Sequence, residues 1–357
     1  MRYTKLLHTF KALLMIGIVS TVFHMNSLPA KANSSTHILQ AMSTGNITQT
    51  NTSVLYDIAP IPASRQPVNT NYYGSPKNPY NELKIATQIT KINNYYFIVD
   101  CYHNQILYTN NFGCPLTEWN VLTNKVNQPH TIAGDGVVYL VDDTENNRIL
   151  VFQETNGRFQ NTQVFPEIGN RPHYIVYDAS TASFYVWSST TGDMYIMKRE
   201  PSTNTMYLTQ VKHMNELQGI YVRSFTLMGD SIIFPSGNNC NIVVADKNTF
   251  EVQVRYPVSP SMSGMAQVYP IGNYFYITVS TNIDGNQSGA TLIRTPSLAS
   301  LYTGQYENIY ELFKTKGTPY YISQIGGNYY MTNHRSAKGV WVFQVNNDVV
   351  SNVRAMY

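Results

Sequence analysis

Cysteine is scarce in this sequence, with Cys101, Cys114 and Cys240 as its three examples among 357 residues. Three cysteines are too few for a disulfide scaffold, so a domain of this size must depend on the packing of a hydrophobic core. Cys101 and Cys114 flank one predicted strand and could pair in an oxidising compartment, which would leave Cys240 unpaired. The sequence alone leaves both the paired and the free state open.

Long hydrophobic runs are also missing after the first 32 residues. Basic residues precede the apolar segment "ALLMIGIVSTVF" (12–23), and Ala30-Lys31-Ala32 supplies a small-x-small cleavage site. This pattern predicts a signal peptide over 1–32, with an uncleaved anchor as the alternative. No later stretch reaches the roughly 20 apolar residues of a membrane span. We therefore expect a secreted, extracellular chain with no stable membrane span after cleavage.

Charge is low, with 13% charged residues. Four of the 24 basic residues and none of the 21 acidic ones lie in the first 32 positions, so 20 basic residues face 21 acidic ones in the mature chain. No basic run remains to follow a phosphate backbone, which excludes nucleic acid as an expected partner. The sequence also lacks a serine nucleophile elbow, a phosphate-binding glycine loop, a CxxC pair and an HExxH motif, which removes the commonest hydrolase, nucleotide and zinc-protease interpretations.

A repeat is present from about residue 83 to the end. Each copy begins with a short strand, continues through a Gly-, Asn- or Asp-containing turn into a second strand, and reaches a third strand after a polar turn. The second strands read "YYFIVD", "VVYLVD", "SFYVWS", "SIIFPS", "YFYITV" and "NYYMTN". Six copies at intervals of about 42 to 54 residues predict an all-β fold, a six-bladed β-propeller with four-stranded antiparallel blades. A seventh blade within the longer interval 280–318 is the alternative.

The predicted organisation has three parts. After the signal peptide, residues 33–80 are rich in Ser, Thr, Asn and Pro and are expected to form a tether, within which "SVLYDIAPI" could dock as a strand. Residues 81–357 form the propeller, which we expect to be a monomer. Either the segment "DVVSNVRAMY" supplies the outer strand of the last blade, or residues 53–60 close the ring.

One repeat resembles a known family. "DGVVYLVDDTENNRILVF" resembles the NHL-type propeller repeat, in which a strand ending in Val-x-Asp is followed by an Asn-rich turn and by Arg-Ile and an apolar run. "NYYFIVDCYHNQILYTN" matches less closely, and the last four blades match in spacing and apolar pattern. The resemblance implies a six-bladed propeller used as a binding platform or, in some secreted members, as an enzyme.

A second resemblance concerns two histidines. Pro129-His130-Thr131-Ile132 and Pro172-His173-Tyr174-Ile175 are similar to the Pro-His context in which the peptidyl-hydroxyglycine α-amidating lyases place zinc-binding histidines. Those lyases take three histidines from alternate blades, whereas this chain has two in adjacent blades. The resemblance therefore does not carry a three-histidine zinc site onto this chain.

The first residues of the inner strands should form a polar ring at the mouth of the central channel. The ring consists of Gln88, His130, His173, Arg223, Gln267 and Tyr320. Its imidazoles, guanidinium and phenol are suited to an anionic or hydroxyl-rich ligand. His103 and His334 lie in loops on the same face and are candidate contacts at the rim.

Three uses of this ring are open. His130 and His173 could ligate one divalent metal such as zinc, and the separate cluster of Asp142, Asp143 and Glu145 could hold calcium. Alternatively, His130, His173, Arg223 and Tyr320 could be catalytic, with a histidine as general base and Arg223 stabilising negative charge in a lyase or hydrolase. In the third case, which we favour, the ring only binds an extracellular glycan, peptide or protein. Asp100 and Asp142 are expected to accept backbone N–H bonds in the turns that follow them.

Overall fold

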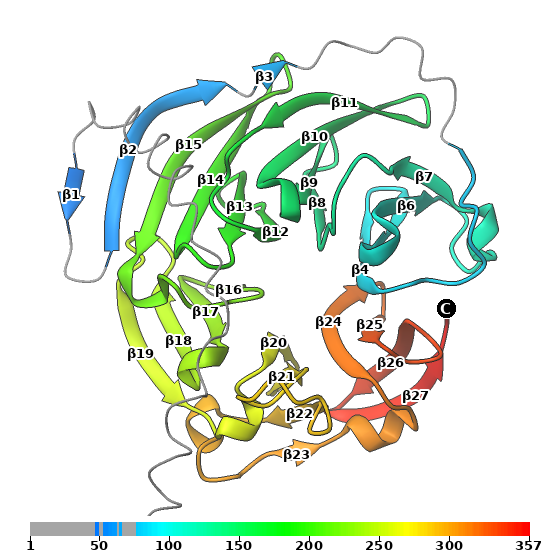
Figure 1. Ribbon diagram of the computed structural model, residues 1–357, viewed down its shortest axis with the longest axis vertical. Coiled ribbons are helices and arrows are strands. Elements are labelled where there is room, and N and C mark those ends of the chain that lie inside the picture. The colour runs from blue at the N-terminus through cyan, green and yellow to red at the C-terminus, as the bar shows by residue number, and fades with distance from the viewer. Residues whose placement is uncertain (1–46, 50–52, 63, 66–75) are drawn as a thin grey trace, which may run out of the picture.

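The computed structural model describes residues 47–49, 53–62, 64–65 and 76–357. The predicted signal peptide and most of the predicted tether lie outside these residues. Antiparallel sheets surround a central axis, with the inner strand of each sheet next to the axis (Figure 1). The prediction of a six-bladed β-propeller is confirmed, and the sheets leave no seventh blade in the interval 280–318.

Each blade is built from four consecutive strands. The first blade contains β4 Ala86–Ile92, β5 Tyr95–Asp100, β6 Gln105–Thr109 and β7 Asn120–Thr123, and the second contains β8 Ile132–Gly134, β9 Val138–Asp143, β10 Arg148–Thr155 and β11 Arg158–Phe165. The third blade contains β12 Pro172–Asp178, β13 Ser183–Ser188, β14 Asp193–Glu200 and β15 Thr205–Met214, and the fourth contains β16 Thr226–Met228, β17 Ser231–Ser236, β18 Asn241–Asp246 and β19 Val252–Pro257. The fifth blade contains β20 Met265–Ile271, β21 Tyr274–Val279, β22 Thr291–Thr295 and β23 Glu307–Asn308, and the sixth contains β24 Thr318–Ile325, β25 Asn328–His334, β26 Val340–Asn346 and β27 Val349–Ala355.

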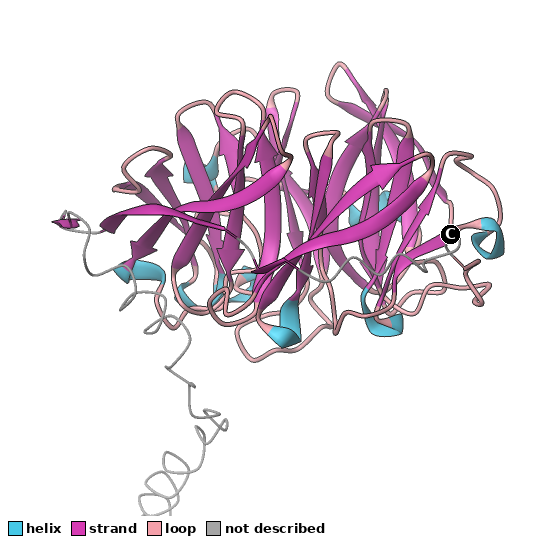
Figure 2. Ribbon diagram, turned by 90° about the horizontal axis from the view of Figure 1, so that it is seen from above, coloured by secondary structure: helices cyan, strands magenta, loops and turns pink. Residues whose placement is uncertain are grey.

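Helix is confined to short 3₁₀ turns in the described residues. They include η1 (Cys101–His103), η3 (Thr144–Asn146) and η5 (Gly237–Asn239), each between the second and third strand of a blade. Loops and short helices lie at the ends of the blades (Figure 2). No helix of the described ranges is long and apolar enough to span a bilayer.

The turns after η1 and η3 explain the asparagines of the repeat. Asn104 and Asn147 adopt the left-handed conformation with φ of 54° and 52°, which asparagine tolerates better than most residues. Their side-chain oxygens then accept the backbone N–H groups of Gln128 at 2.9 Å and Arg171 at 2.8 Å. Each asparagine therefore connects its own blade to the segment that enters the next one.

The core is divided among the interfaces between blades. The described residues form six hydrophobic clusters, each drawn mainly from two neighbouring blades. Phe97 of β5, for example, packs against Tyr139 of β9, and Trp187 of β13 packs against Phe234 of β17. Because both faces of a blade are covered, its inner strands are continuous apolar runs rather than alternating ones.

The C-terminal segment completes the last blade, as the first of the two closure alternatives predicted. Strand β27 is the outer strand of the sixth blade. Beyond it, Tyr357 reaches the first blade, where its hydroxyl donates to the carbonyl of Cys114 at 3.3 Å and its ring lies edge-on to Trp119. The ring of blades is thus closed by packing between the first and last blades, and each keeps its own four strands.

The other alternative for closure is wrong, because β2 (Ser53–Pro62) joins a different blade. It pairs antiparallel with β15 at the outside of the third blade, and β1 (Ile47–Gln49) pairs with β2. Strand β3 (Ser64–Arg65) pairs with β11 of the second blade. The prediction that "SVLYDIAPI" docks as a strand is confirmed, whereas the bounds of the tether stay a prediction.

Candidate functional site

A pocket of about 200 Å³ lies at the end of the propeller where the inner strands begin. We call it the central pocket, and all six blades contribute to it. Its lining residues are Ile85, Thr87, Cys101, Tyr102, Gln128, His130, Arg171, Tyr221, Arg223, Ser280, Thr281, Gln287, Thr318, Tyr320, His334 and Arg335. Its volume lies below the range of most drug-sized ligand sites and suits a small molecule or the end group of a larger one.

His130 presents one ring nitrogen to the pocket and turns the other toward the second blade. Its Nδ1 lies 2.9 Å from the hydroxyl of Thr144, and that hydroxyl lies 3.4 Å from Oδ1 of Asp142. Because both oxygens of Asp142 accept backbone N–H groups, from His130 and Thr131, the Thr144 hydroxyl donates to this carboxylate. It therefore accepts from Nδ1–H, which leaves the lone pair of His130 on Nε2.

His173 lies behind His130 and does not line the pocket. The two imidazole rings lie against each other with their centroids 3.7 Å apart and their planes inclined by 30°, and His173 is fully buried. Its Nδ1 contacts the hydroxyl of Tyr321 at 3.1 Å, and this hydroxyl donates to the carbonyl of Arg223. Nδ1 therefore carries the proton, and Nε2 accepts from the hydroxyls of Tyr221 at 2.9 Å and Tyr320 at 3.3 Å. His173 thus orients two phenols that line the pocket.

The histidines of the site are neutral. Burial lowers the pKa of His130 and of His173 well below the ordinary value, and neighbouring positive groups, Arg171 and Arg223 among them, lower both further. Burial and the charge of Arg223 lower the pKa of His334 to about 3. Burial also raises the pKa of Tyr320 well above its usual range, so its phenol keeps its proton.

Three guanidinium groups line the central pocket, and no carboxylate appears among its lining residues. Arg171 forms an ion pair with Glu145, Arg223 donates to the carbonyls of Gly264 at 3.2 Å and Met265 at 3.4 Å, and Arg335 bonds the side chain of Gln287. The guanidinium carbons of Arg171 and Arg223 lie 5.9 Å and 5.1 Å from the ring centre of Tyr221. Of the three guanidinium groups, Arg171 alone has a carboxylate ion partner among the described residues.

Two polar atoms of this lining are buried without a hydrogen-bond partner in the described chain. They are Nε of Arg171 and Nε2 of His334. A buried polar group that lacks a partner costs about 1–3 kcal/mol, so such atoms mark places where a ligand or water completes the bonding. Both atoms belong to residues of one pocket, which makes that pocket the candidate binding site.

Gln88 and Gln267 lie elsewhere, which corrects the predicted ring. The side-chain oxygen of Gln88 accepts the N–H of Ile132 at 2.8 Å, and that of Gln267 accepts the N–H of Ile322 at 2.6 Å. Both glutamines therefore connect inner strands of neighbouring blades. Their strands contain register shifts just before these residues. In the first blade the residue inside the shift, Thr87, lines the pocket in place of Gln88, and the fifth blade reaches the pocket through Ser280 and Thr281.

Tyr320, Arg223 and His130 do line the central pocket, as predicted, and His334 lines it as well. Four further lining residues were not among those predicted, namely Gln128, Arg171, Tyr221 and Thr318. Each of these stands two positions before a ring residue, and alternate residues of an extended chain face the same side. Counting two residues back from His130, His173, Arg223 and Tyr320 would therefore have found all four.

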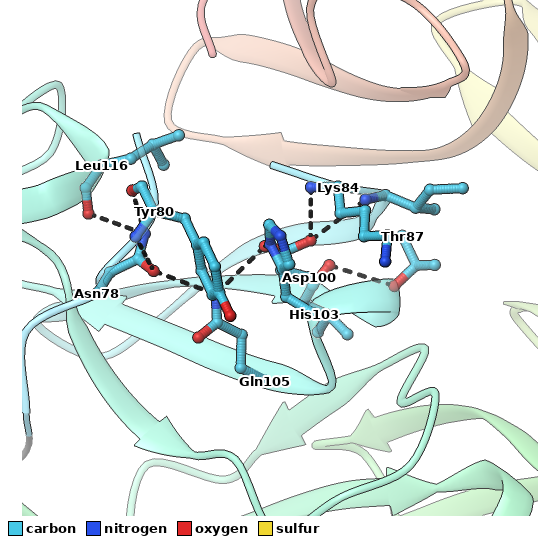
Figure 3. Close-up of polar contacts among 10 residues, drawn as sticks. Asn78, Tyr80, Lys84, Thr87, Asp100, His103, Gln105 and Leu116 are labelled. Carbon is cyan, nitrogen blue, oxygen red and sulfur yellow. Dashed lines mark hydrogen bonds and ion pairs between the residues drawn. The ribbon is translucent and has the colours of Figure 1, made fainter. Parts of the chain in front are cut away.

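In the first blade, a buried aspartate bonds the segment that leads into the inner strand (Figure 3). The carboxylate of Asp100 accepts the backbone N–H groups of Lys84 at 3.0 Å and Ile85 at 3.2 Å, and it lies 2.6 Å from Nδ1 of His103. The ring of His103 stacks on Tyr80 with centroids 3.7 Å apart. Asp142 accepts the N–H groups of His130 and Thr131 in the same way, so the backbone donors come from the segment before the inner strand, and the turn after each aspartate contributes side chains, His103 and Thr144. The expected backbone bonds within that turn are therefore corrected. His103 does not line the pocket.

The geometry gives little support to a metal site. The Nε2 lone pair of His173 accepts from the hydroxyls of Tyr221 and Tyr320, and His173 does not line the pocket, so its lone pair does not join that of His130 at one ion. Asp143 accepts from Arg148 at 2.6 Å and from the N–H of Asn127 at 2.6 Å, and Glu145 pairs with Arg171, so these carboxylates face cations and donors of the chain itself. No group of three or more His, Cys, Asp or Glu in the described chain could hold a metal.

The three cysteines are free thiols in the structure. Cys114 is buried beside Thr109, and Cys240 is half-buried. Cys101 lines the pocket, with its sulfur 3.9 Å from Nε2 of His130. The Cys101–Cys114 pairing that the sequence left open is therefore not formed.

Comparison with known proteins finds the fold but no family. No protein-family model and no curated protein matches the chain. Among solved structures, a candidate 6-phosphogluconolactonase from Bacteroides fragilis aligns with a TM-score of 0.55 at 10% identity, over 87% of this chain and 94% of that chain. A streptogramin B lyase aligns with a TM-score of 0.52 at 12% identity, over 79% and 86% of the two chains. At such identities the likeness shows a shared β-propeller fold alone.

Proposed function

We propose that this chain binds a hydroxylated organic anion in the central pocket, either as a free acid or as the acidic end of a glycan or peptide. The observation that carries the proposal is a pocket with three guanidinium groups, no lining carboxylate, and two buried polar atoms that lack partners. A carboxylate suits this charge because the planar fork of an arginine bonds both of its oxygens.

The hydroxyl groups follow from the imidazoles. The imidazole of His334 forms a hydrogen bond with the backbone of Ala86, and this bond raises the pKa of the imidazole. A bond that raises this pKa is one in which the ring N–H donates to a carbonyl oxygen. The other nitrogen of His334, Nε2, has no partner in the described chain. Nδ1 is then the donor, and Nε2 carries a lone pair. Nε2 of His130 likewise has a lone pair beside the pocket. Two lone pairs next to guanidinium donors are complementary to a ligand that bears hydroxyl groups as well as an anion.

Isothermal titration calorimetry with three probes tests the proposal. Gluconate carries both a carboxylate and hydroxyls, sorbitol carries hydroxyls alone, and hexanoate carries a carboxylate alone. We expect gluconate to bind at least tenfold more tightly than either of the others, because each lacks one kind of contact. Equal affinities, or no binding of gluconate, would contradict the proposal.

An arginine variant locates the binding site. Arg335→Met removes a guanidinium group whose side chain bonds Gln287, and it should weaken gluconate binding about tenfold or more, as the loss of a charge-assisted bond does. Arg255→Met is the matched control, because it removes the same charge from the outer strand β19, where Arg255 forms an ion pair with Glu216. Equal losses in the two variants would place binding outside the pocket.

Catalysis by a lyase or hydrolase is the second candidate, and one observation favours it. The contacts from Asp142 through Thr144 to His130 orient a basic lone pair toward the pocket, as a general base requires. Incubation of the protein with lactones and with hydroxy acids, followed by mass spectrometry, would detect turnover. A loss of that turnover in His130→Gln, with gluconate binding retained, would support this second function.

The location and the kinship of the chain are also proposals. Residues 1–32 have the sequence of a signal peptide, which supports export. The left-handed Asn104 and Asn147 occupy the Asn-rich turns of the two repeats that resemble NHL-type propellers. Those shared turns support kinship with that group.

A further inference from the structure

We propose that Cys101 and His130 form a thiol–imidazole pair that reacts with carboxylates bearing an electrophilic carbon when these enter the central pocket. The inference rests on the proposed function, since the arginines that bind an anion would also deliver such a reagent to the thiol. It adds a reactive cysteine to a site otherwise assigned to binding.

The pair and its neighbour form a row in which Cys101 is the nucleophile, His130 is the base and Thr144 orients the base. The sulfur of Cys101 lies 3.9 Å from Nε2 of His130, within reach of a thiol hydrogen bond. Nδ1 of the same imidazole is held by Thr144, so Nε2 is the nitrogen that can accept the thiol proton. A base whose second nitrogen is fixed by a third group is the arrangement that activates nucleophiles in enzymes.

Access to Cys101 is through the pocket. The residue is 1% exposed, yet it is part of the pocket wall. A reagent must therefore occupy the pocket before it meets the sulfur. Cys114 is also buried but lies in the core beside Thr109, and Cys240 is half-buried away from the pocket. The chain thus contains its own comparison thiols.

The buried atom of Arg171 provides an independent sign of a ligand beside this thiol. Its Nε has no partner in the described chain. Burial raises the pKa of the Cys101 thiol, the charges of Asp142 and Asp100 raise it further, and the charge of Arg171 lowers it in part. Burial lowers the pKa of His130. The pair therefore rests as a neutral thiol and a neutral imidazole.

The reaction requires no co-reactant. The sulfur of Cys101 forms a bond to the electrophilic carbon, the bond from that carbon to its leaving group breaks, and the leaving group departs with the electron pair. The thiol proton passes to Nε2 of His130. With iodoacetate the leaving group is iodide, and the product is a carboxymethyl thioether.

Competing alkylation by iodoacetate and by iodoacetamide tests the pair, because the two reagents differ in charge and are similar in size. Mass spectrometry of the native full chain gives the labelling rate at each cysteine. We expect the iodoacetate-to-iodoacetamide rate ratio at Cys101 to exceed that at Cys240 about tenfold or more. Gluconate should protect Cys101 and leave Cys240 unaffected.

Variants separate the parts of the argument. His130→Gln should slow the labelling of Cys101 by both reagents. The control is His213→Gln, which removes an imidazole of β15 that bonds Asp193, and it should leave the labelling rate of Cys101 unchanged. An unlabelled Cys101, a rate ratio equal to that of Cys240, or no effect of His130→Gln would overturn the inference. Gluconate binding by Cys101→Ser is measured separately by calorimetry, so failure of the reactive pair is distinguishable from failure of anion binding.

Discussion

Acidification from pH 7 to pH 5 should destabilise this fold through histidines held neutral in the folded state. His130, His173 and His334 have depressed pKa values in the folded protein, with that of His334 at about 3, whereas the unfolded chain titrates near 6.5. Below pH 6.5 the unfolded state therefore binds more protons than the folded state, and the free energy of unfolding falls as the pH falls.

The magnitude follows from the width of this window. Each pH unit is worth about 1.4 kcal/mol for one such group, so each histidine contributes a loss of about 2 kcal/mol between pH 6.5 and pH 5. Two groups shift the opposite way. The bond to Asp193 raises the pKa of His213, and burial raises that of Asp142, so protonation of either favours the folded state. Because three groups lose and two gain over this range, we expect a net loss of about 2 kcal/mol, a sizeable part of the stability of a typical domain.

Urea unfolding at pH 7, 6 and 5 measures this loss directly. His173→Gln should reduce the dependence on pH by about 1.4 kcal/mol per unit below pH 6, because one titrating group is removed. A free energy of unfolding that is equal at pH 7 and pH 5 would refute the argument. A pH dependence of His173→Gln equal to that of the original chain would show that His173 is not held neutral.

Two further predictions concern stability. Gln267→Leu should lower the free energy of unfolding in urea by about 2–4 kcal/mol, because it leaves the N–H of Ile322 and the hydroxyl of Tyr174 without their partner. The control is Gln324→Leu, at an exposed position of the inner strand β24, which should change the free energy of unfolding by no more than about 0.5 kcal/mol. Tyr357→Ala should lower the free energy of unfolding by about 2–4 kcal/mol, because the contacts with Trp119 and Cys114 are lost. Tyr302→Ala, at a tyrosine that is 66% exposed, should change the free energy of unfolding little. Equal effects of the two variants would contradict closure of the ring by Tyr357.

The architecture was predictable because its signals are local. Turn residues such as Asn93, with φ of 52°, mark the hairpins, and apolar runs such as "YYFIVD" mark buried strands. Repetition of the same local pattern then indicates the number of blades. The end of the chain at Tyr357 could not be placed in advance, because two segments had a strand-like sequence and the choice depends on packing against Trp119.

The site was only partly predictable, for reasons of register and depth. His130 and Tyr320 stand at the expected place, but the register shifts near Gln88 and Gln267 depend on tertiary contacts that alternation cannot reveal. His173 follows a proline as His130 does and yet lies behind it, with the two ring centroids 3.7 Å apart, an arrangement that the local sequence does not specify. Arg171 and Cys101 occupy segments between strands, and their place in the pocket depends on how neighbouring blades meet.

The most direct measurement is a crystal structure of the protein with gluconate bound. The carboxylate should lie within hydrogen-bond distance of Nε of Arg171, and a hydroxyl should lie at a similar distance from Nε2 of His334, so that both buried atoms gain partners. Gluconate bound at another surface, or a pocket that holds the molecule while these two atoms keep no partner, would contradict the account.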